Sequence, residues 1–251
     1  MNRHLFVITG ASRGMGLAMA RQLLDQGHTL LCISRRDNPA LTDHAARTQA
    51  SLTQWTQDLA DSSTLGIRLS EWLTAQSNTG WSSATLINNA GVIPRIAPLS
   101  ELGSADIAQA MRVGLEAPMH LTAVFLRATQ TWAVPRKVLN ISSGLGRRAM
   151  ASQAAYCAAK AGMDHFTRCV ALEEALKPNG AKVCSLAPGV IDTDMQVQLR
   201  QADAASFPDR GSFIGLQSGG QLTSPDDAAA RVLNYLARSD FGAQPVGDVR
   251  D

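Results

Sequence analysis

The sequence predicts an α/β fold, with helices on both faces of a doubly wound, seven-stranded parallel sheet, in three α/β/α layers. Short β-branched or apolar runs alternate with longer segments of helical periodicity, which indicates repeated βα units. A glycine-rich turn follows the first apolar run and opens the first helical segment. The length of 251 residues suits one large α/β domain with a single sheet. We therefore expect one domain over residues 1–251.

Seven runs justify the seven strands, and helices are expected between them. The strands are LFVI at 5–8, TLLCI at 29–33, TQWT at 53–56, ATLI at 84–87, KVLNI at 137–141, KVCS at 182–185 and QPVGDV at 244–249. The segment 153–177 carries Met163, Phe166 and Val170 at helical spacing, and a Pro-Asn-Gly turn ends it. The segment 192–224 mixes Gly, Ser, Gln and Pro with isolated apolar residues, so we expect it to form a substrate lid.

Charge and composition favour a small-molecule partner. The formal net charge is +2 with scattered Lys and Arg, which is too mild for a nucleic-acid or membrane surface. Met1 leads within a few residues into the first strand, and no apolar run reaches membrane-spanning length, so a cytoplasmic location is expected. Four cysteines lack C-x-x-C spacing and are expected as buried free thiols in a reducing compartment. They are Cys32, Cys157, Cys169 and Cys184.

The turn TGASRGMG at 9–16 predicts a phosphate-binding loop. Gly10 permits a tight turn, Gly14 lets a pyrophosphate approach the backbone, and Gly16 allows close packing of the helix. The spacing is G-x-x-x-G-x-G, which differs from the commonest dinucleotide fingerprint. Its position at the first βα junction is what favours nucleotide binding.

The end of the second strand predicts which nucleotide binds. A carboxylate there would bind a ribose 2′-hydroxyl, but this chain has Ser34, Arg35 and Arg36, with Arg13 in the glycine loop nearby. These cations suit a 2′-phosphate, so we expect NADPH rather than NADH. Solvated surface arginines are the alternative, which accounts for Arg36 more easily than for Arg35.

Three residues predict a proton donor. Tyr156 and Lys160 are four residues apart on one helical face, and Ser143 lies thirteen residues before the tyrosine at a strand end. We expect Lys160 to lower the pKa of the phenol and Ser143 to hydrogen-bond the substrate oxygen. Ser142 points to the other face of its strand and is expected to hydrogen-bond locally. The alternative is a chance Tyr and Lys beside a capping serine.

Five ordered motifs give the chain its resemblance to the short-chain dehydrogenase/reductase family, with its Rossmann-type fold. They are TGASRGMG at 9–16, QDL at 57–59, NNAG at 88–91, the set Ser143, Tyr156 and Lys160, and PGVIDT at 188–193. The resemblance implies NADPH-dependent reduction of a ketone, diketone or pterin side-chain carbonyl. Expected NADP(H)-binding residues are Gly10, Ser12, Arg13, Gly14, Met15, Gly16, Ser34, Arg35, Arg36, Asp58, Leu59, Asn89, Ala90, Gly91, Tyr156, Lys160, Pro188, Gly189, Val190, Ile191 and Thr193.

Within the family, the C-terminal third is most similar to the sepiapterin reductase and benzil reductase group. The similarity rests on APGVIDTDMQ at 187–196, LTSPDDAA at 222–229 and the short tail at 240–251. It implies an acidic tail residue that anchors substrate, for which Asp251 is the nearest match and Asp248 the second. A charged, frayed terminus is the alternative for Asp251.

The substrate itself is expected to be a flat or aromatic carbonyl compound. Ser143, Tyr156, Met150 and Met195 are the expected contacts besides Asp251, and the lid segment adds apolar side chains around Phe213. Those apolar side chains equally suit packing of the lid against the body. No metal is expected, because no histidine or further acid clusters with Asp192 and Asp194, which we expect to cap a loop or short helix.

One position departs from the family pattern. Gly114 stands where relatives usually carry an asparagine that holds a proton-relay water. Either the space left by the missing side chain admits an extra water, or turnover is slowed. The rival to an enzyme is an NADPH-binding sensor or assembly subunit with little turnover. The resemblance also implies a homodimer or homotetramer, paired through the helices at about 100–130 and 153–177.

Overall fold

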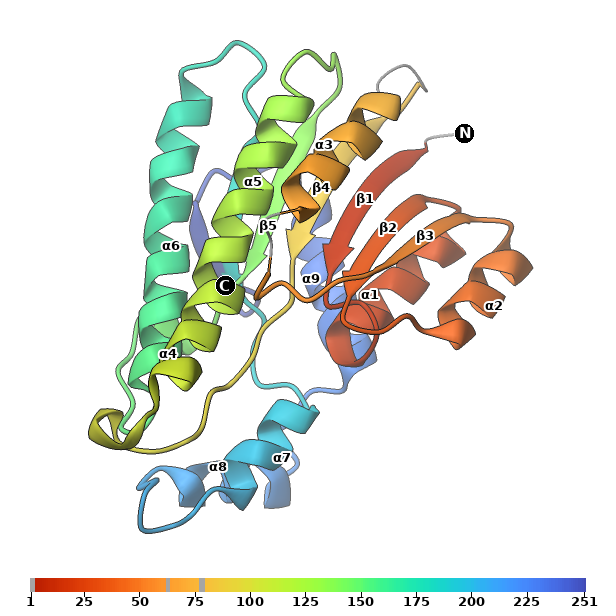
Figure 1. The fold of residues 1–251 in the computed structure, drawn as a ribbon. Helices are drawn as coiled ribbons and strands as arrows, with labels where there is room; N and C mark the ends of the chain where they lie inside the picture. The colour runs from red at the N-terminus through yellow and green to blue at the C-terminus, as the bar shows by residue number, and fades with distance from the viewer. Residues whose placement is uncertain (1–2, 62–63, 77–79) are drawn as a thin grey trace.

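The computed structural model describes residues 3–61, 64–76 and 80–251, and its centre is one parallel sheet (Figure 1). The strands run in the order β3-β2-β1-β4-β5-β6-β7. Their bounds are β1 His4–Thr9, β2 Thr29–Ser34, β3 Ser51–Thr56, β4 Ser83–Asn88, β5 Arg136–Ile141, β6 Lys182–Ala187 and β7 Val246–Asp248. All seven predicted strands are confirmed, each within two residues at either end.

The strand order reverses at β1, which pairs with β2 on one side and β4 on the other. The chain winds outward from β1 in one direction and returns to wind outward from β4 in the other. In such doubly wound sheets, ligands bind outside the carboxyl ends of the strands at this reversal. The fold therefore places a binding site where β1 and β4 end.

Helices cover both faces of the sheet (Figure 1). One face carries α1, α2 and α9, with bounds α1 Gly14–Asp25, α2 Pro39–Thr48 and α9 Pro225–Ala237. The other carries α3 to α6, with bounds α3 Leu65–Ala75, α4 Ser104–Met111, α5 Ala117–Ala128 and α6 Ala154–Ala175. Three short helical turns are η1 Leu99–Glu101, the π-helical η2 Arg112–Glu116 and η3 Gly144–Gly146. The α6 bounds confirm the helix predicted over 153–177.

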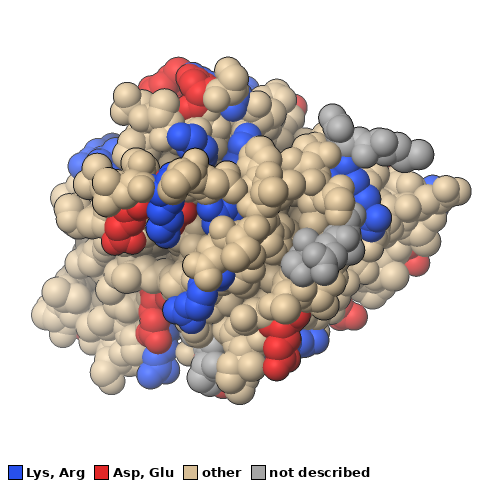
Figure 2. Space-filling model, turned by 90° about the horizontal axis from the view of Figure 1, so that it is seen from above, with Lys and Arg blue, Asp and Glu red and all other residues tan. Residues whose placement is uncertain are grey.

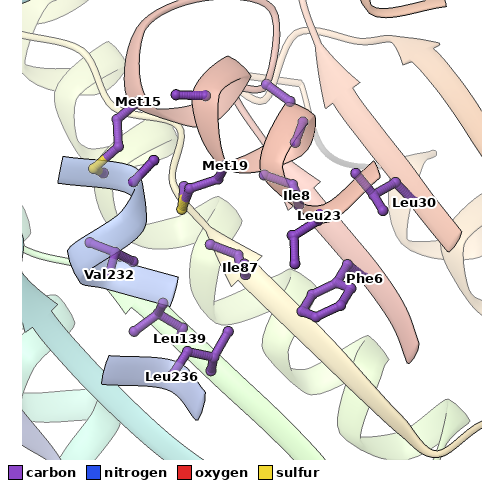
Figure 3. Packing of buried hydrophobic residues seen from close by; sticks show 14 of the residues in the cluster. Phe6, Ile8, Met15, Met19, Leu23, Leu30, Ile87, Leu139, Val232 and Leu236 are labelled. Carbon is purple, nitrogen blue, oxygen red and sulfur yellow. The ribbon is translucent and has the colours of Figure 1, made fainter. Parts of the chain in front are cut away.

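Two apolar cores result from strand alternation. Phe6 and Ile8 point to one face, where they pack with residues of α1 and α9 such as Met19 and Val232 (Figure 3). Leu5 and Val7 point to the other face, into a core with α3 and α5 that includes Phe125. Because helices bury both faces, the strands read as nearly continuous apolar runs in the sequence.

The expected lid segment contains two short helices, α7 Asp194–Gln201 and α8 Arg210–Ser218. Figure 1 shows them as a separate layer beyond the end of the sheet. Phe207, 1% exposed, stacks on Phe213 with 5.6 Å between ring centroids. The lid therefore has apolar packing of its own, and Phe213 also lines the cavity described below.

The surface and the cysteines add two observations. Basic and acidic side chains are interspersed on the face that Figure 2 shows, and no helix among the described residues is long and apolar enough to cross a membrane. Cys32 and Cys184 are buried and Cys157 is half-buried, but Cys169 is exposed. The prediction of four core cysteines is thus wrong for Cys169, which lies on the outer side of α6.

Candidate functional site

A cavity of about 1360 Å³ lies at the carboxyl ends of the strands, where the strand order reverses. Its wall contains every residue that the sequence predicted for the cofactor and all three predicted catalytic residues. Met150 and Met195, predicted to contact substrate, also line it. We call the end near Arg35 the nucleotide end, and the end near Tyr156 and Met150 the substrate end.

In the glycine loop, the backbone passes close to other backbone atoms at Gly10 and Gly16. Gly10 has φ of 71°, a left-handed conformation, and a Cβ there would lie 2.8 Å from the Ala90 Cα. A Cβ on Gly16 would lie 2.2 Å from the Gly10 carbonyl oxygen. The Asn89 side chain donates to the carbonyl oxygens of Thr9 and Gly10, at 3.0 and 3.1 Å. The side-chain nitrogen of Asn89 therefore braces the loop from the end of β4.

The nucleotide end carries positive charge and an unpaired hydroxyl. Arg35 and Arg36 are exposed on the cavity wall, and the Ser34 hydroxyl beside them is buried without a hydrogen-bond partner among the described residues. Arg13 differs from expectation, because its guanidinium pairs with the carboxylate of Asp194 on α7. Arg13 thus links the glycine loop to α7, and Ser34, Arg35 and Arg36 remain at the strand end.

The catalytic candidates meet at the substrate end. Tyr156 and Lys160 lie one turn apart on α6 and are 8% and 4% exposed. The Lys160 Nζ donates to the carbonyl oxygen of Ile141 at 2.7 Å and lies 5.8 Å from the centre of the tyrosine ring. Ser143 lies just after β5, where its hydroxyl oxygen accepts from the Leu145 N–H at 3.1 Å. The end of β5 therefore holds both the lysine and the serine beside the tyrosine.

Burial dominates the ionisation of this pair. It raises the pKa of Tyr156 to about 12, although a hydrogen bond with Ser143 acts in the opposite direction. Burial likewise lowers the pKa of Lys160 to about 8, opposed by the negative charge of Asp164. The net shift of the Tyr156 pKa is upward, with burial as its main cause, whereas the sequence predicted a lowering by Lys160. The phenol keeps its proton at neutral pH, as a proton donor requires.

Asp164 is a residue that the sequence reasoning missed. Its buried carboxylate accepts hydrogen bonds from Ser142 and Ser185, both at 2.6 Å, and from Arg147 at 3.3 Å. The available signal was its spacing, because Asp164 lies four residues after Lys160 on the same face of α6. The Ser142 bond agrees with the local role expected for that side chain.

The C-terminal tail corrects one prediction. Asp251 is exposed and does not line the cavity, whereas Asp248, 7% exposed, does. Asp248 ends β7, so the sheet holds it at the cavity, and Arg250 donates two hydrogen bonds of 2.7 Å to its carboxylate. Asp251 lies three residues beyond the end of β7 and is exposed.

Gly114 sits in the π-helical turn η2 and is buried. A Cβ there would lie 3.0 Å from the Ala159 Cβ on α6, so the neighbouring helix already occupies part of the space. Whether an extra water or slower turnover accompanies the missing side chain stays a prediction. Glycine is favoured at this position because η2 packs so close to α6 that a larger side chain would crowd Ala159.

Asp192 and Asp194 have separate arginine partners. Asp192 lies 3.9 Å from Arg200, while Asp194 pairs with Arg13. Asp194 is the first residue of α7, the short helix at whose start the sequence predicted it. Its negative charge at a helix N-terminus is favourable.

Together, the doubly wound sheet, the glycine loop and the Ser-Tyr-Lys set are typical of a class of nucleotide-dependent oxidoreductases. The family model for short chain dehydrogenases matches residues 4–204. The chain therefore belongs to the short-chain dehydrogenase/reductase family, whose members use NAD(H) or NADP(H).

Curated relatives and solved structures agree with this membership. The chain is 38% identical to a benzil reductase ((S)-benzoin forming) of Bacillus cereus, covering 97% of this chain and 96% of the relative. It is 30% identical to the sepiapterin reductase of Meriones unguiculatus, covering 94% and 92%. A short-chain dehydrogenase/reductase structure from Burkholderia vietnamiensis is 32% identical with a TM-score of 0.66, covering 99% of both chains. A putative 2-deoxy-D-gluconate 3-dehydrogenase from Agrobacterium tumefaciens with bound NADP is 27% identical with a TM-score of 0.79, covering 98% and 94%.

Proposed function

We propose that this protein is an NADPH-dependent carbonyl reductase that converts a ketone or 1,2-diketone to an alcohol. The observation that carries the proposal is a buried Tyr156, beside Lys160 and Ser143, in the wall of a cavity large enough for a dinucleotide and a small substrate. The similarity to benzil and sepiapterin reductases supports diketones and pterin side-chain carbonyls as the substrate classes.

The residues present fit NADPH. At Gly10 and Gly16 a Cβ would fill space against the loop backbone, so the loop has the tight shape that suits a pyrophosphate at the start of α1. The orphaned Ser34 hydroxyl and the two exposed arginines after it suit a phosphate on the adenosine ribose. Asp58 and Leu59 would hold the adenine side, and Val190, Ile191 and Thr193 the carboxamide side.

Bound NADPH supplies the hydride that reduces the carbonyl carbon. Tyr156 donates its proton to the carbonyl oxygen as negative charge develops there, and Ser143 hydrogen-bonds the same oxygen. Lys160, held by the Ile141 carbonyl, places a positive charge near the phenolate that remains. A proton from solvent then restores the phenol, which balances the reaction.

Steady-state kinetics with benzil, sepiapterin and a simple ketone tests the proposal. We expect NADPH consumption with stoichiometric alcohol formation, and a kcat/KM at least tenfold higher with NADPH than with NADH. Arg35→Ala should remove most of that preference, since an arginine–phosphate contact is charge-assisted. Arg21→Ala, on the exposed side of α1, is the matched control. Tight NADPH binding without turnover across the panel would instead favour the sensor alternative.

We also propose that the protein assembles as a homodimer or homotetramer through the outer sides of α5 and α6. Leu172 and Leu176 on this side are 72% and 87% exposed, and Met119 on α5 is 46% exposed. Light scattering of the wild type and of Leu172→Glu tests this assembly. A wild-type monomer would contradict it.

A further inference from the structure

A buried glutamine lines the cavity at its substrate end and lacks a partner. Gln153 is 2% exposed, and it directly precedes α6. Neither its amide nitrogen nor its amide oxygen has a hydrogen-bond partner among the residues that the structure describes. Buried amides are almost always paired, because an unpaired one loses its bonds to water and gains none. Because Gln153 lines the cavity, a partner for this amide is to be sought there.

The backbone around Gln153 is held on both sides. Ser152 has φ of 61°, an uncommon left-handed value for a residue other than glycine, and its hydroxyl donates to the Ser206 carbonyl of the lid segment. The Gln153 carbonyl oxygen accepts from the Cys157 N–H at 2.8 Å, inside the first turn of α6. The strained turn and the helix together fix where the amide side chain begins.

The position of Gln153 relative to Tyr156 indicates which substrate atom the Gln153 amide can contact. Gln153 is the N-cap residue of α6 and Tyr156 is the third residue of that helix, so the two lie within about one turn of each other. Tyr156 acts on the oxygen of the reacting carbonyl, so a donor one turn earlier is placed for an oxygen on a neighbouring carbon. The Gln153 amide nitrogen supplies that donor, and a carbonyl oxygen is the matching acceptor.

We infer that Gln153 recognises the second oxygen of a 1,2-dicarbonyl substrate by donating a hydrogen bond from its amide nitrogen. This inference rests on the proposed carbonyl reduction, of which it names the specificity-determining residue. One carbonyl is reduced and the other stays intact on the hydrogen bond. The Gln153 amide oxygen can then accept from the hydroxyl formed on the adjacent carbon, so the same side chain suits substrate and product.

Apolar residues give the cavity its shape near this end. Leu145, Met150, Leu199 and Phe213 line the cavity near this end and suit flat, apolar substituents on the two carbonyl carbons. Gln196 on α7 also has a buried, unpaired amide oxygen, but that atom only accepts and a diketone offers it no donor.

Benzil and deoxybenzoin test the inference, because deoxybenzoin replaces one of the two benzil carbonyls by a methylene. The variant is Gln153→Met, which keeps the length and removes the amide. We expect kcat/KM for benzil to fall about tenfold, and the value for deoxybenzoin to change by about twofold or less. If deoxybenzoin turns over too slowly, its inhibition constant against benzil gives the same comparison.

The control is Gln26→Met, the same change at an exposed glutamine that does not line the cavity, which should leave the ratio between the two compounds unchanged. Thermal unfolding verifies that each variant is folded, and Gln153→Glu replaces Gln153→Met if the latter is not. An equal loss for both compounds, or no loss for benzil, overturns the inference while leaving carbonyl reduction intact. Failure of the wild type to reduce any carbonyl would instead contradict the proposed function.

Discussion

Lys160 and Asp164 lie one turn apart on the buried face of α6, and the aspartate charge raises a lysine pKa that burial lowers to about 8. The lysine also donates to the Ile141 carbonyl, and the aspartate accepts from side chains that follow β5 and lie within β6. The charge state of the lysine is thus set by groups that sit behind the cavity wall.

The first prediction concerns the alkaline side of the pH profile. Lys160 carries its charge below its pKa of about 8 and loses it above. Tyr156, with a pKa of about 12, stays protonated throughout this range. We expect kcat/KM for benzil to be constant near neutral pH and to fall above about pH 8. A profile that stays flat to pH 9.5 would contradict the role given to the lysine charge.

The second prediction concerns Asp164→Asn. The change removes the negative charge that raises the Lys160 pKa, so the alkaline fall in kcat/KM should move to lower pH. A purely structural role would lower activity at all pH values without moving the midpoint. Glu173→Gln, at an exposed acid on the same helix, is the control and should not shift it.

The five inner strands could be predicted because each is a short apolar run between helical segments, and buried parallel strands show this pattern. The edge strands β3 and β7 carry fewer apolar residues. Tyr156, Lys160 and the glycine loop could be predicted because their chemistry depends on local spacing. Asp164 and Gln153 could not, since their importance comes from burial and from partners distant in the chain. Asp251 was preferred to Asp248 because the family resemblance implies an acidic residue near the end of the tail, and Asp251 is the nearest match to it.

The third prediction concerns the close contact at Gly114. Gly114→Asn alone should lower the free energy of unfolding by about 1–3 kcal/mol, because the new Cβ crowds Ala159. Adding Ala159→Gly makes room, so the double variant should lose less than the sum of the two single changes. Urea unfolding measures these values.

Turnover of the same double variant tests the relay idea. The asparagine that relatives carry should raise kcat above that of the wild type once it fits. An unchanged kcat in a well-folded double variant would show that position 114 plays no part in proton transfer.

The fourth prediction concerns stability in acid. Burial, with a smaller effect from His4, lowers the pKa of His28 to about 4. Between about pH 4 and 6.5 the unfolded chain therefore binds more protons than the folded chain, so stability should fall as the pH falls through this window. His28→Phe keeps a ring stacked on Phe6 and removes the titration.

Urea midpoints at pH 7.0 and 4.5 provide the measurement. The difference between the two midpoints should be smaller in His28→Phe than in the wild type, and unchanged in His165→Gln, which alters an exposed histidine. An equal difference in all three proteins would show that His28 does not contribute to acid sensitivity.

The most direct test of the central claim is Tyr156→Phe, which removes only the proton-donating hydroxyl. Benzil reduction should fall by about 10²-fold or more, while the NADPH dissociation constant, measured by fluorescence, stays within about twofold of the wild type. Turnover close to the wild-type rate, or a large loss of NADPH affinity, would contradict the account of Tyr156 as the proton donor.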